Sequence, residues 1–345
     1  MRPLGRSDIT VSALCLGTMM YGDQISQEDA NRQMDRCFER GINFFDTAEL
    51  YTVPPKPDTQ GESERIVGDW MKAQQVRDKI VLATKVAGRS NFFHLRDGRE
   101  PRVNTQDIRF AIERSLKNLS TDYIDLYQIH WPDRRSPMFG MELSGYNHYD
   151  EDYHSFEEAM ETLGTLQKEG KIREFGLSNE TPYGVMKMAT LSEQKNLPRP
   201  QSIQNAYNLI NRNFEIGLAE IAMQENVGLL AYSPIAQGAL TGKYLNGEKP
   251  VGSRGALFGR LGRYETPSAD KAIQNYVELA KSLSIDPAAL AMQFVTTREF
   301  VTSNIFGARN DSQLDVIFDS LEIKWTDEIA AAVNKLHAQY PSPCP

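Results

Sequence analysis

The 345-residue chain has few cysteines, no long apolar run and no closely spaced glycine pair of the kind that opens a nucleotide-binding loop. Its cysteines are Cys15, Cys37 and Cys344. Because no CxxC pair occurs, they predict neither a zinc ribbon nor a disulfide framework. No apolar run approaches the roughly 18 residues that a membrane span needs. The first residues contain no apolar segment of the signal-peptide type, so we expect a cytoplasmic protein without a membrane segment.

Negative charge exceeds positive charge in this chain. The chain has 38 lysines and arginines against 46 aspartates and glutamates, a formal net charge of −8. This balance argues against nucleic-acid binding as the main role, although a local basic pocket for a small phosphate stays open. The 5 histidines show no metal-ligand spacing, so we expect no metal site. The carboxylates are spread too widely to predict a glycosidase pair.

The chain does contain a regular alternation of short apolar runs and amphipathic segments. Several runs are nearly continuous in apolar residues, as in strands that are buried on both faces. The runs predict strands at residues 13–17, 43–46, 80–85, 124–130, 174–178, 203–205, 228–232 and 303–306. The segments between them predict helices at residues 27–40, 62–74, 105–119, 155–169, 182–195, 214–225, 268–283 and 311–320.

Eight strand-then-helix units predict an α/β fold, a single (β/α)8 TIM barrel domain over residues 1–345. A doubly wound sheet is the alternative, but it usually carries a G-x-G motif after its first strand, and no two glycines here are separated by one residue. Residues 1–12 predict an N-terminal hairpin that plugs the barrel. Residues 286–298 and 326–338 predict extra C-terminal helices.

Three long loops follow predicted strands, at residues 88–104, 131–154 and 244–267. A barrel would place all three on its C-terminal rim, where the active sites of this fold are built. We therefore expect these loops to surround any active site, and the aromatic loop at 131–154 to influence the choice of substrate.

Four residues with acid–base chemistry stand at or after the ends of three consecutive predicted strands. Asp46, Lys85 and His130 end strands, and Tyr51 lies five residues after Asp46. Each alone has an ordinary structural explanation, but a charged group on a barrel strand must be paired or functional. Together they suit proton donation to a carbonyl, with an ammonium that lowers the pKa of the phenol and a neutral imidazole that orients the substrate oxygen. Because the set has no electron source, reduction implies a hydride cofactor.

Polar and aromatic residues in the second half of the chain suit such a cofactor. Ser178, Asn179 and Gln204 offer hydroxyl and amide groups to a carboxamide, and the ring of Tyr232 could stack on a flat nicotinamide.

Basic residues gather after the seventh predicted strand. Residues 243–263 contain five lysines and arginines against one glutamate, in a glycine-rich segment. Open backbone amides with arginine and lysine suit a clamp over phosphates. Gly307 and Arg309 precede the last predicted barrel helix, and a helix N-terminus is a second place for a phosphate.

The segments that carry these residues resemble the aldo-keto reductase superfamily. The matching strings include GINFFDTAELY at 41–51, ATKV at 83–86, SLKNLSTDYIDLYQIHWPD at 115–133, GKIREFGLSN at 170–179, YSPIAQGALTGKY at 232–244 and FGARNDSQL at 306–314. They cover nearly the whole chain in order, and their spacing is closest to that of bacterial reductases related to potassium-channel β subunits. The resemblance implies a barrel enzyme that reduces aldehydes or ketones to alcohols with NADPH.

The resemblance also implies roles for single residues. Asp46, Tyr51, Lys85 and His130 match the catalytic four, with Tyr51 as the proton donor. The residues that match NADPH/NADP+ contacts are Gly17, Thr18, Met19, Gln24, Asp46, Ser178, Asn179, Gln204, Tyr232, Ser233, Pro234, Ile235, Ala236, Gln237, Gly238, Leu240, Lys243, Arg254, Gly307, Arg309 and Gln313.

One departure from the pattern of this superfamily concerns adenine. Val316 and Ile317 stand where the pattern has an acid and an asparagine, so we expect weaker contacts to adenine.

Two other interpretations stay open. A catalytically weak NADP-binding regulatory subunit agrees with the likeness to channel β subunits, although those relatives often carry asparagine at the position of His130, and His130 favours an enzyme. A barrel lyase would use Lys85 as a Schiff-base amine, which leaves Asp46 and Tyr51 without evident roles.

A small carbonyl compound is the expected partner. The sequence leaves open the substrate itself, the strictness of the NADPH preference and a homo-oligomeric state.

Overall fold

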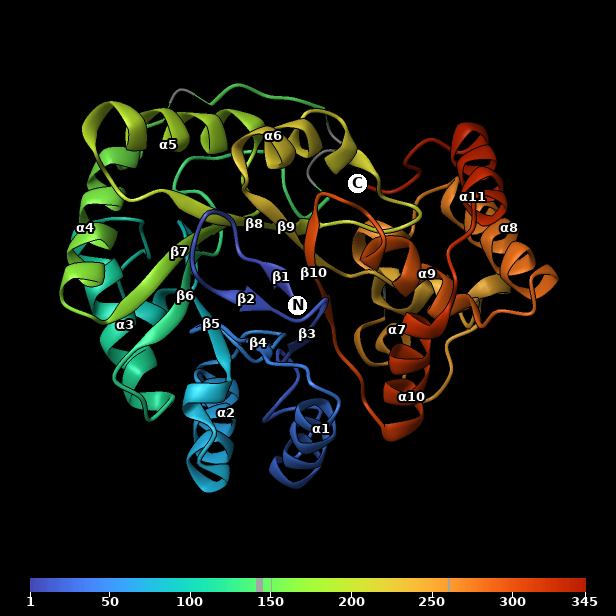
Figure 1. Cartoon of the computed structure of the whole chain (residues 1–345), viewed down its shortest axis with the longest axis horizontal. Helices are drawn as coiled ribbons and strands as arrows, with labels where there is room; N and C mark the ends of the chain where they lie inside the picture. The colour runs from blue at the N-terminus through green and yellow to red at the C-terminus, as the bar shows by residue number, and fades with distance from the viewer. Residues whose placement is uncertain (141–144, 150, 260) are drawn as a thin grey trace.

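Eight parallel strands close into a barrel that is surrounded by helices (Figure 1). The computed structural model describes residues 1–140, 145–149, 151–259 and 261–345. The strands follow one another around the barrel in chain order, and the last, β10 (Val301–Phe306), pairs in parallel with the first, β3 (Leu14–Gly17). The (β/α)8 fold class is therefore confirmed, and the doubly wound alternative is wrong.

The elements lie close to the predicted ranges. The other barrel strands are β4 (Phe44–Asp46), β5 (Val81–Val86), β6 (Ile124–Ile129), β7 (Ile172–Ser178), β8 (Pro200–Ala206) and β9 (Gly228–Tyr232). The helices are α1 (Gln27–Glu39), α2 (Glu62–Gln74), α3 (Thr105–Asn118), α4 (Phe156–Lys168), α5 (Pro182–Lys195), α6 (Leu218–Glu225), α7 (Arg254–Phe258), α8 (Ala269–Ser282), α9 (Pro287–Thr296), α10 (Asp311–Asp319) and α11 (Asp327–Gln339).

Local residue chemistry sets several helix ends. Ser26 caps α1 by accepting a hydrogen bond from the backbone N–H of Asp29, which satisfies one of the free donors of the first turn. The helix predicted at residues 214–225 is broken by Gly217, whose φ of +97° lies outside helical geometry. A 3-10 turn over Asn213–Glu215 precedes this break, and α6 begins only after it.

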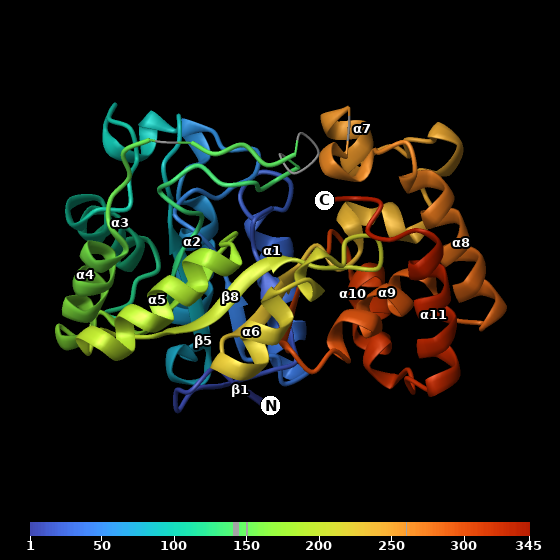
Figure 2. The same ribbon diagram turned by 90° about the horizontal axis from the view of Figure 1, so that it is seen from above.

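The N-terminal hairpin closes the bottom of the barrel, as predicted. Its strands β1 (Arg2–Pro3) and β2 (Thr10–Val11) pair in antiparallel fashion. Leu4, Ile9 and Val11 pack with apolar residues from the strands, among them Phe44 and Leu230, in one buried cluster. Figure 2 shows β1 at the end of the molecule opposite α7. The hairpin therefore seals one end of the barrel and leaves the C-terminal rim for the long loops.

The helices after β9 differ from the prediction, because α7 lies in the predicted loop at residues 244–267 and because α8 and α9 exchange their predicted roles. The sequence assigned the barrel-covering role to residues 268–283 and treated 286–298 as an addition. In the structure, α9 packs on β10 and has eight buried residues, whereas α8 packs against α9 and α11. Figure 1 shows α8 and α11 at the outer edge, beyond α9. A helix that is apolar on nearly all sides belongs between two layers, which explains why α9 lies inside.

Within the described residues, no helix is both long and apolar enough to cross a membrane.

The hairpin plug predicts a stability effect. Leu4 is fully buried, so Leu4→Ala should lower the free energy of unfolding by about 2–5 kcal/mol, because it removes apolar contacts and leaves a cavity. Leu321 is 44% exposed, and Leu321→Ala is the matched control that should change stability little. Urea denaturation of both variants measures the difference. Equal stabilities would mean that the hairpin contributes no packing energy.

Candidate active site

Lys85 is the centre of a buried polar cluster at the C-terminal end of the barrel. Its side chain is fully buried, and its Nζ donates to three oxygens. The acceptors are Asp46 Oδ2 at 2.5 Å, the Thr47 carbonyl at 2.7 Å and the Tyr51 hydroxyl at 3.5 Å. An ammonium has three protons to donate, so each one has an acceptor. The ion pair thus fixes the hydroxyl of Tyr51 beside a positive charge.

Asp46 is held by amides as well as by the ammonium. Its second oxygen, Oδ1, accepts from Gln128 Nε2 at 3.0 Å and from Gln204 Nε2 at 2.9 Å. The two amides also bond to each other, because Gln204 Nε2 lies 3.0 Å from Gln128 Oε1. The carboxylate therefore has defined partners on β5, β6 and β8, as a buried charge requires.

The phenol and the imidazole lie against each other above this cluster. The ring centroids of Tyr51 and His130 are 5.7 Å apart, with an interplanar angle of 77°. Both side chains are buried. Burial, followed by the nearby ammonium of Lys85, lowers the pKa of His130 well below its ordinary value. At neutral pH the imidazole is therefore uncharged, which agrees with the neutral role that the sequence suggested.

The pKa of Tyr51 departs from the expectation. The sequence suggested that the ammonium would lower the pKa of Tyr51, yet burial raises it and the positive charge of Lys85 opposes this only in part. Burial also lowers the pKa of Lys85, but Asp46 and Tyr51 more than offset this effect and the net shift is upward. The resting state of the cluster is thus a neutral phenol beside a charged ammonium.

The candidate carboxamide residues form a neighbouring network. Asn179 Nδ2 donates to the backbone carbonyl of His130 at 2.9 Å and lies 3.0 Å from Ser178 Oγ. The hydroxyl of Tyr232 donates to Asn179 Oδ1 at 2.7 Å, and Ser178 Oγ donates to the backbone carbonyl of Gln204 at 2.8 Å. These predicted residues from β7, β8 and β9 therefore meet beside the acid–base group.

The residues predicted after β3 lie on the same rim. Thr18 is buried and its Oγ1 donates to the carbonyl of Asp46 at 3.1 Å. Gly17 ends β3, and a Cβ there would lie 2.9 Å from the side chain of Ile305. Gln24 donates from Nε2 to the carbonyl of Val53 at 2.8 Å, whereas Met19 is half-buried. Gln24 thus holds the loop that follows Tyr51 in this structure.

The segment after β9, residues 233–243, turns with an unusual backbone. Ser233, Ala236, Gln237 and Gly238 all have positive φ values, between 49° and 92°. The φ of +92° at Gly238 favours glycine, which also leaves room for the amine of Lys243, 2.9 Å from where a Cβ would lie. Among the other predicted contacts here, Pro234 and Leu240 are buried and Ile235 is half-buried.

A second group of cations lies where α7 and α10 begin. Arg254 opens α7 after its cap Ser253. Arg309 precedes α10, its backbone N–H donates to Gln313 Oε1 at 2.9 Å, and a Cβ at Gly252 would lie 3.9 Å from its guanidinium. Gly307 leaves β10 beside Met20. Cations and a helix N-terminus suit a phosphate, so the donor set fits the phosphates of a dinucleotide.

The departure at the adenine positions has a structural counterpart. Ile317 packs into the hydrophobic core and Val316 is half-buried, both on α10. Neither side chain carries a hydrogen-bonding group, so the expectation of weaker adenine contacts stays a prediction.

Two residues near the site were missed from the sequence. Gln128 lies on β6, two positions before His130, which directly follows the strand, so the two residues face the same side. Its polar side chain inside an apolar run was the available signal. Arg263 was counted only as a loop cation, yet its guanidinium donates to the Tyr232 hydroxyl at 3.3 Å and lies 5.7 Å from the ring centroid of Phe139. Arg263 thereby joins two rim loops above the barrel.

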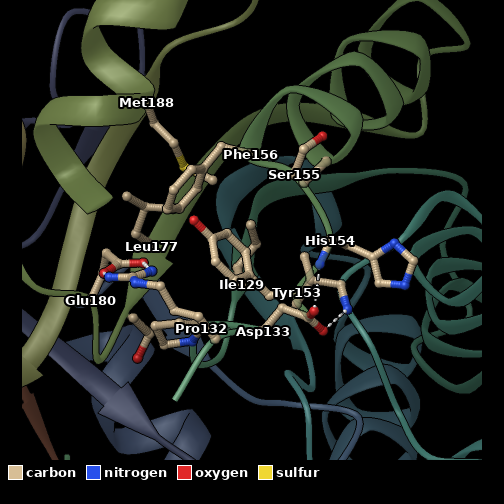
Figure 3. A pocket seen from close by; sticks show the side chains of 14 residues that line it. Ile129, Pro132, Asp133, Tyr153, His154, Ser155, Phe156, Leu177, Glu180 and Met188 are labelled. Atoms are coloured by element: carbon tan, nitrogen blue, oxygen red, sulfur yellow. Dashed lines mark hydrogen bonds and ion pairs between the residues drawn. The ribbon is translucent and has the colours of Figure 1, made fainter. Parts of the chain in front are cut away.

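A small pocket outside the barrel lies near the site but is separate from its acid–base group. Figure 3 shows its walls, which include Ile129 and Leu177 from two strands and Met188 from α5. Its volume of about 20 Å³ is the space of a single water molecule. None of the four acid–base residues lines it.

The buried imidazole predicts a pH dependence of stability. Since the pKa of His130 is depressed in the folded state, the unfolded chain binds a proton that the folded chain does not, and stability falls as pH drops below about 6.5. The contribution of one group is at most about 1.4 kcal/mol per pH unit. Urea denaturation between about pH 7.5 and about pH 5 should show a smaller loss for His130→Gln than for the unsubstituted protein. Parallel curves would contradict the buried, uncharged state.

Sequence comparison finds similar proteins over nearly the whole chain. The profile of the Aldo/keto reductase family matches residues 13–338. The protein named Tas of Escherichia coli is 43% identical over 342 residues, 98% of each chain. Norsolorinic acid reductase B of Aspergillus parasiticus is 27% identical and aligns with 96% of this chain and 82% of its own. A probable voltage-gated potassium channel subunit beta of rice is 26% identical over 93% of this chain and 90% of its own.

Proposed function

The chain belongs to the aldo/keto reductase family, and from this premise we propose that it reduces aldehydes or ketones to alcohols with NADPH, with Tyr51 as the proton donor. The observation that carries the proposal is the set of contacts around Lys85. Its ammonium donates to Asp46, to the Thr47 carbonyl and to the Tyr51 hydroxyl. Because the hydroxyl oxygen of Tyr51 accepts from Lys85, its own proton is left to point toward a substrate oxygen.

The surrounding charges favour release of that proton during a reduction. The pKa of Tyr51 is raised by burial, so the phenol is protonated before the reaction. When the proton leaves, the phenolate that forms is stabilised by the adjacent ammonium. The uncharged imidazole of His130 can donate one hydrogen bond to the carbonyl oxygen without competing as an acid. Asp46 keeps Lys85 charged throughout.

The remaining predicted residues would hold the cofactor. In this proposal Ser178, Asn179 and Gln204 would bind the carboxamide and Tyr232 would stack on the nicotinamide ring, while Lys243, Arg254 and Arg309 would bind the phosphates. When bound, a reduced nicotinamide supplies the hydride that the side chains lack. The chain's own groups orient the carbonyl and provide the proton.

The lyase alternative fits the site poorly. A Schiff-base lysine has to be an uncharged nucleophile. The pKa of Lys85 is raised, because Asp46 and Tyr51 outweigh the effect of burial, and every proton of its ammonium has an acceptor. The regulatory alternative rests on the rice channel subunit among the relatives, and an activity assay separates it from an enzyme.

We also propose one functional unit over residues 1–345, a cytoplasmic location and small carbonyl compounds as partners. The barrel strands and the added helices pack in one continuous core, which supports a single unit. A homo-oligomer would agree with the likeness to channel β subunits.

Tyr51→Phe tests the proton donor directly. The substitution keeps the ring and removes the hydroxyl, so turnover of a panel of aldehydes and ketones should fall by at least about 100-fold. The loss of NADPH absorbance measures turnover, and NADPH fluorescence should show nearly unchanged cofactor binding. Full turnover in Tyr51→Phe would refute the role of the hydroxyl. If none of the carbonyl compounds in the panel supports oxidation of NADPH by the unsubstituted protein, the result favours the regulatory interpretation instead.

Arg254→Ala tests the phosphate assignment. An arginine at the 2′-phosphate should matter for NADPH and little for NADH, so we expect the Kd for NADPH to rise by about 10-fold or more. Lys249 lies in the same loop and is exposed, so Lys249→Ala serves as the control. Fluorescence titration with both cofactors gives the comparison. Equal losses for NADPH and NADH would remove Arg254 from the 2′-phosphate site.

A further inference from the structure

A second buried ion pair lies two residues before Tyr51 in the chain. Glu49 and Arg96 are both at most 1% exposed. The guanidinium binds the carboxylate with two parallel bonds, from Nη1 to Oε2 and from Nη2 to Oε1, each 2.8 Å long. This bidentate geometry is the strongest form of an arginine–carboxylate contact. Glu49 belongs to the loop after β4, and Arg96 belongs to the loop after β5.

Glu49 attaches the loop that carries Tyr51 to the end of β5. Its backbone N–H donates to the carbonyl of Lys85 at 3.3 Å, and its Oε1 accepts from the backbone N–H of Ala87 at 2.7 Å. The two contacts lie on either side of Val86, the last residue of β5. Glu49 therefore continues the pairing of the two strands beyond the barrel, by using its side chain as a second acceptor.

Arg96 also pairs with a second carboxylate, that of Asp107. Its Nε lies 3.5 Å from Oδ2 of Asp107, which is buried near the start of α3. The same carboxylate accepts from the backbone N–H of Arg102 at 2.8 Å. The chain of contacts thus runs from α3 through Arg96 to Glu49, and from there to the loop of Tyr51.

Stability alone is a weak reason for this arrangement. Removing two charges from water is costly, and a buried ion pair is often no more stabilising than apolar residues of the same volume. A bidentate pair does fix the relative position of the two loops, because both hydrogen bonds form only when the guanidinium and the carboxylate are aligned. The hydroxyl of Tyr51 needs such specification, since a displacement of about 1 Å in a reacting group can cost about 100-fold in rate.

We propose that Glu49 and Arg96 are positioning residues that hold Tyr51 at its place between Lys85 and His130. The inference rests on the proposed role of Tyr51 and adds a cause for its placement. Neither residue touches the hydroxyl of Tyr51. They act by fixing the loop after β4 against the loop after β5.

The chain offers a matched control at the opposite end of the barrel. Asp125 on β6 is 2% exposed. Like Glu49, it accepts a hydrogen bond from a backbone N–H and forms ion pairs with arginine. It accepts from the N–H of Leu82 at 3.0 Å and pairs with Arg77 and Arg173, each at 2.8 Å. Asp125 therefore resembles Glu49 in burial and bonding, but it is remote from Tyr51.

The experiment compares Glu49→Gln with Asp125→Asn. Each amide keeps the shape of its acid and removes a buried carboxylate from its arginine partners, so both variants should lower Tm. Only Glu49→Gln should reduce kcat for an aldehyde, by about 10- to 100-fold, with KM and the Kd for NADPH changed by no more than about 2-fold. Arg96→Lys keeps the charge but loses the fork, and it should give the same pattern. It also serves as the test if Glu49→Gln does not fold.

A measurement without turnover separates this proposal from the proposed function. The ring-carbon NMR signal of Tyr51, assigned with Tyr51→Phe, should move in Glu49→Gln and Arg96→Lys and stay in place in Asp125→Asn. A protein that reduces no carbonyl compound would overturn the reductase proposal, yet this signal would still decide the positioning role. An unmoved signal, or an equal loss of kcat in Asp125→Asn, would overturn the inference.

Discussion

A buried ammonium needs an acceptor for each of its protons, and this requirement organises the C-terminal end of the barrel. Lys85 meets it with a carboxylate, a backbone carbonyl and a phenol. Two of these acceptors, Thr47 and Tyr51, lie in the loop after β4, so the loop must fold back over the neighbouring strand. The positive charge also helps to keep His130 uncharged. The position of the Tyr51 hydroxyl therefore follows from this constraint, and burial together with the same charge keeps His130 neutral.

The two ends of the barrel interior have different chemistry for a physical reason. At the bottom, the N-terminal hairpin supplies Leu4 and Val11 to an apolar cluster that excludes water. At the top, Gln128 and Gln204 complete the hydrogen bonding of Asp46, so a charged group can remain inside the barrel. The apolar lower end thus supports a polar upper end, where the long loops lie.

Residues that are far apart in the sequence were correctly predicted to lie close together where each one stands at or near the end of a strand. Asp46 and Lys85 stand at strand ends, and parallel strands in a barrel bring such ends to one rim. The prediction was wrong about which of two neighbouring apolar helices packs directly on the barrel strands. Helix α9 is apolar on nearly all sides, and whether it or α8 covers the barrel depends on packing partners that the sequence does not display. Gln128 was missed because one polar residue in an apolar run gives no spacing to test.

The sequence by itself determined the kind of fold, the approximate ends of most elements and the meeting of Asp46, Tyr51, Lys85 and His130 at one end of the barrel. These depend on apolar periodicity and on side-chain chemistry, which are properties of short segments. Tertiary structure alone decided the protonation of the cluster. The pKa of Tyr51 rises instead of falling, because burial outweighs the attraction of Lys85. It also decided that Glu49 and Arg96 meet, since a contact between two loops follows from how the chain closes around the barrel.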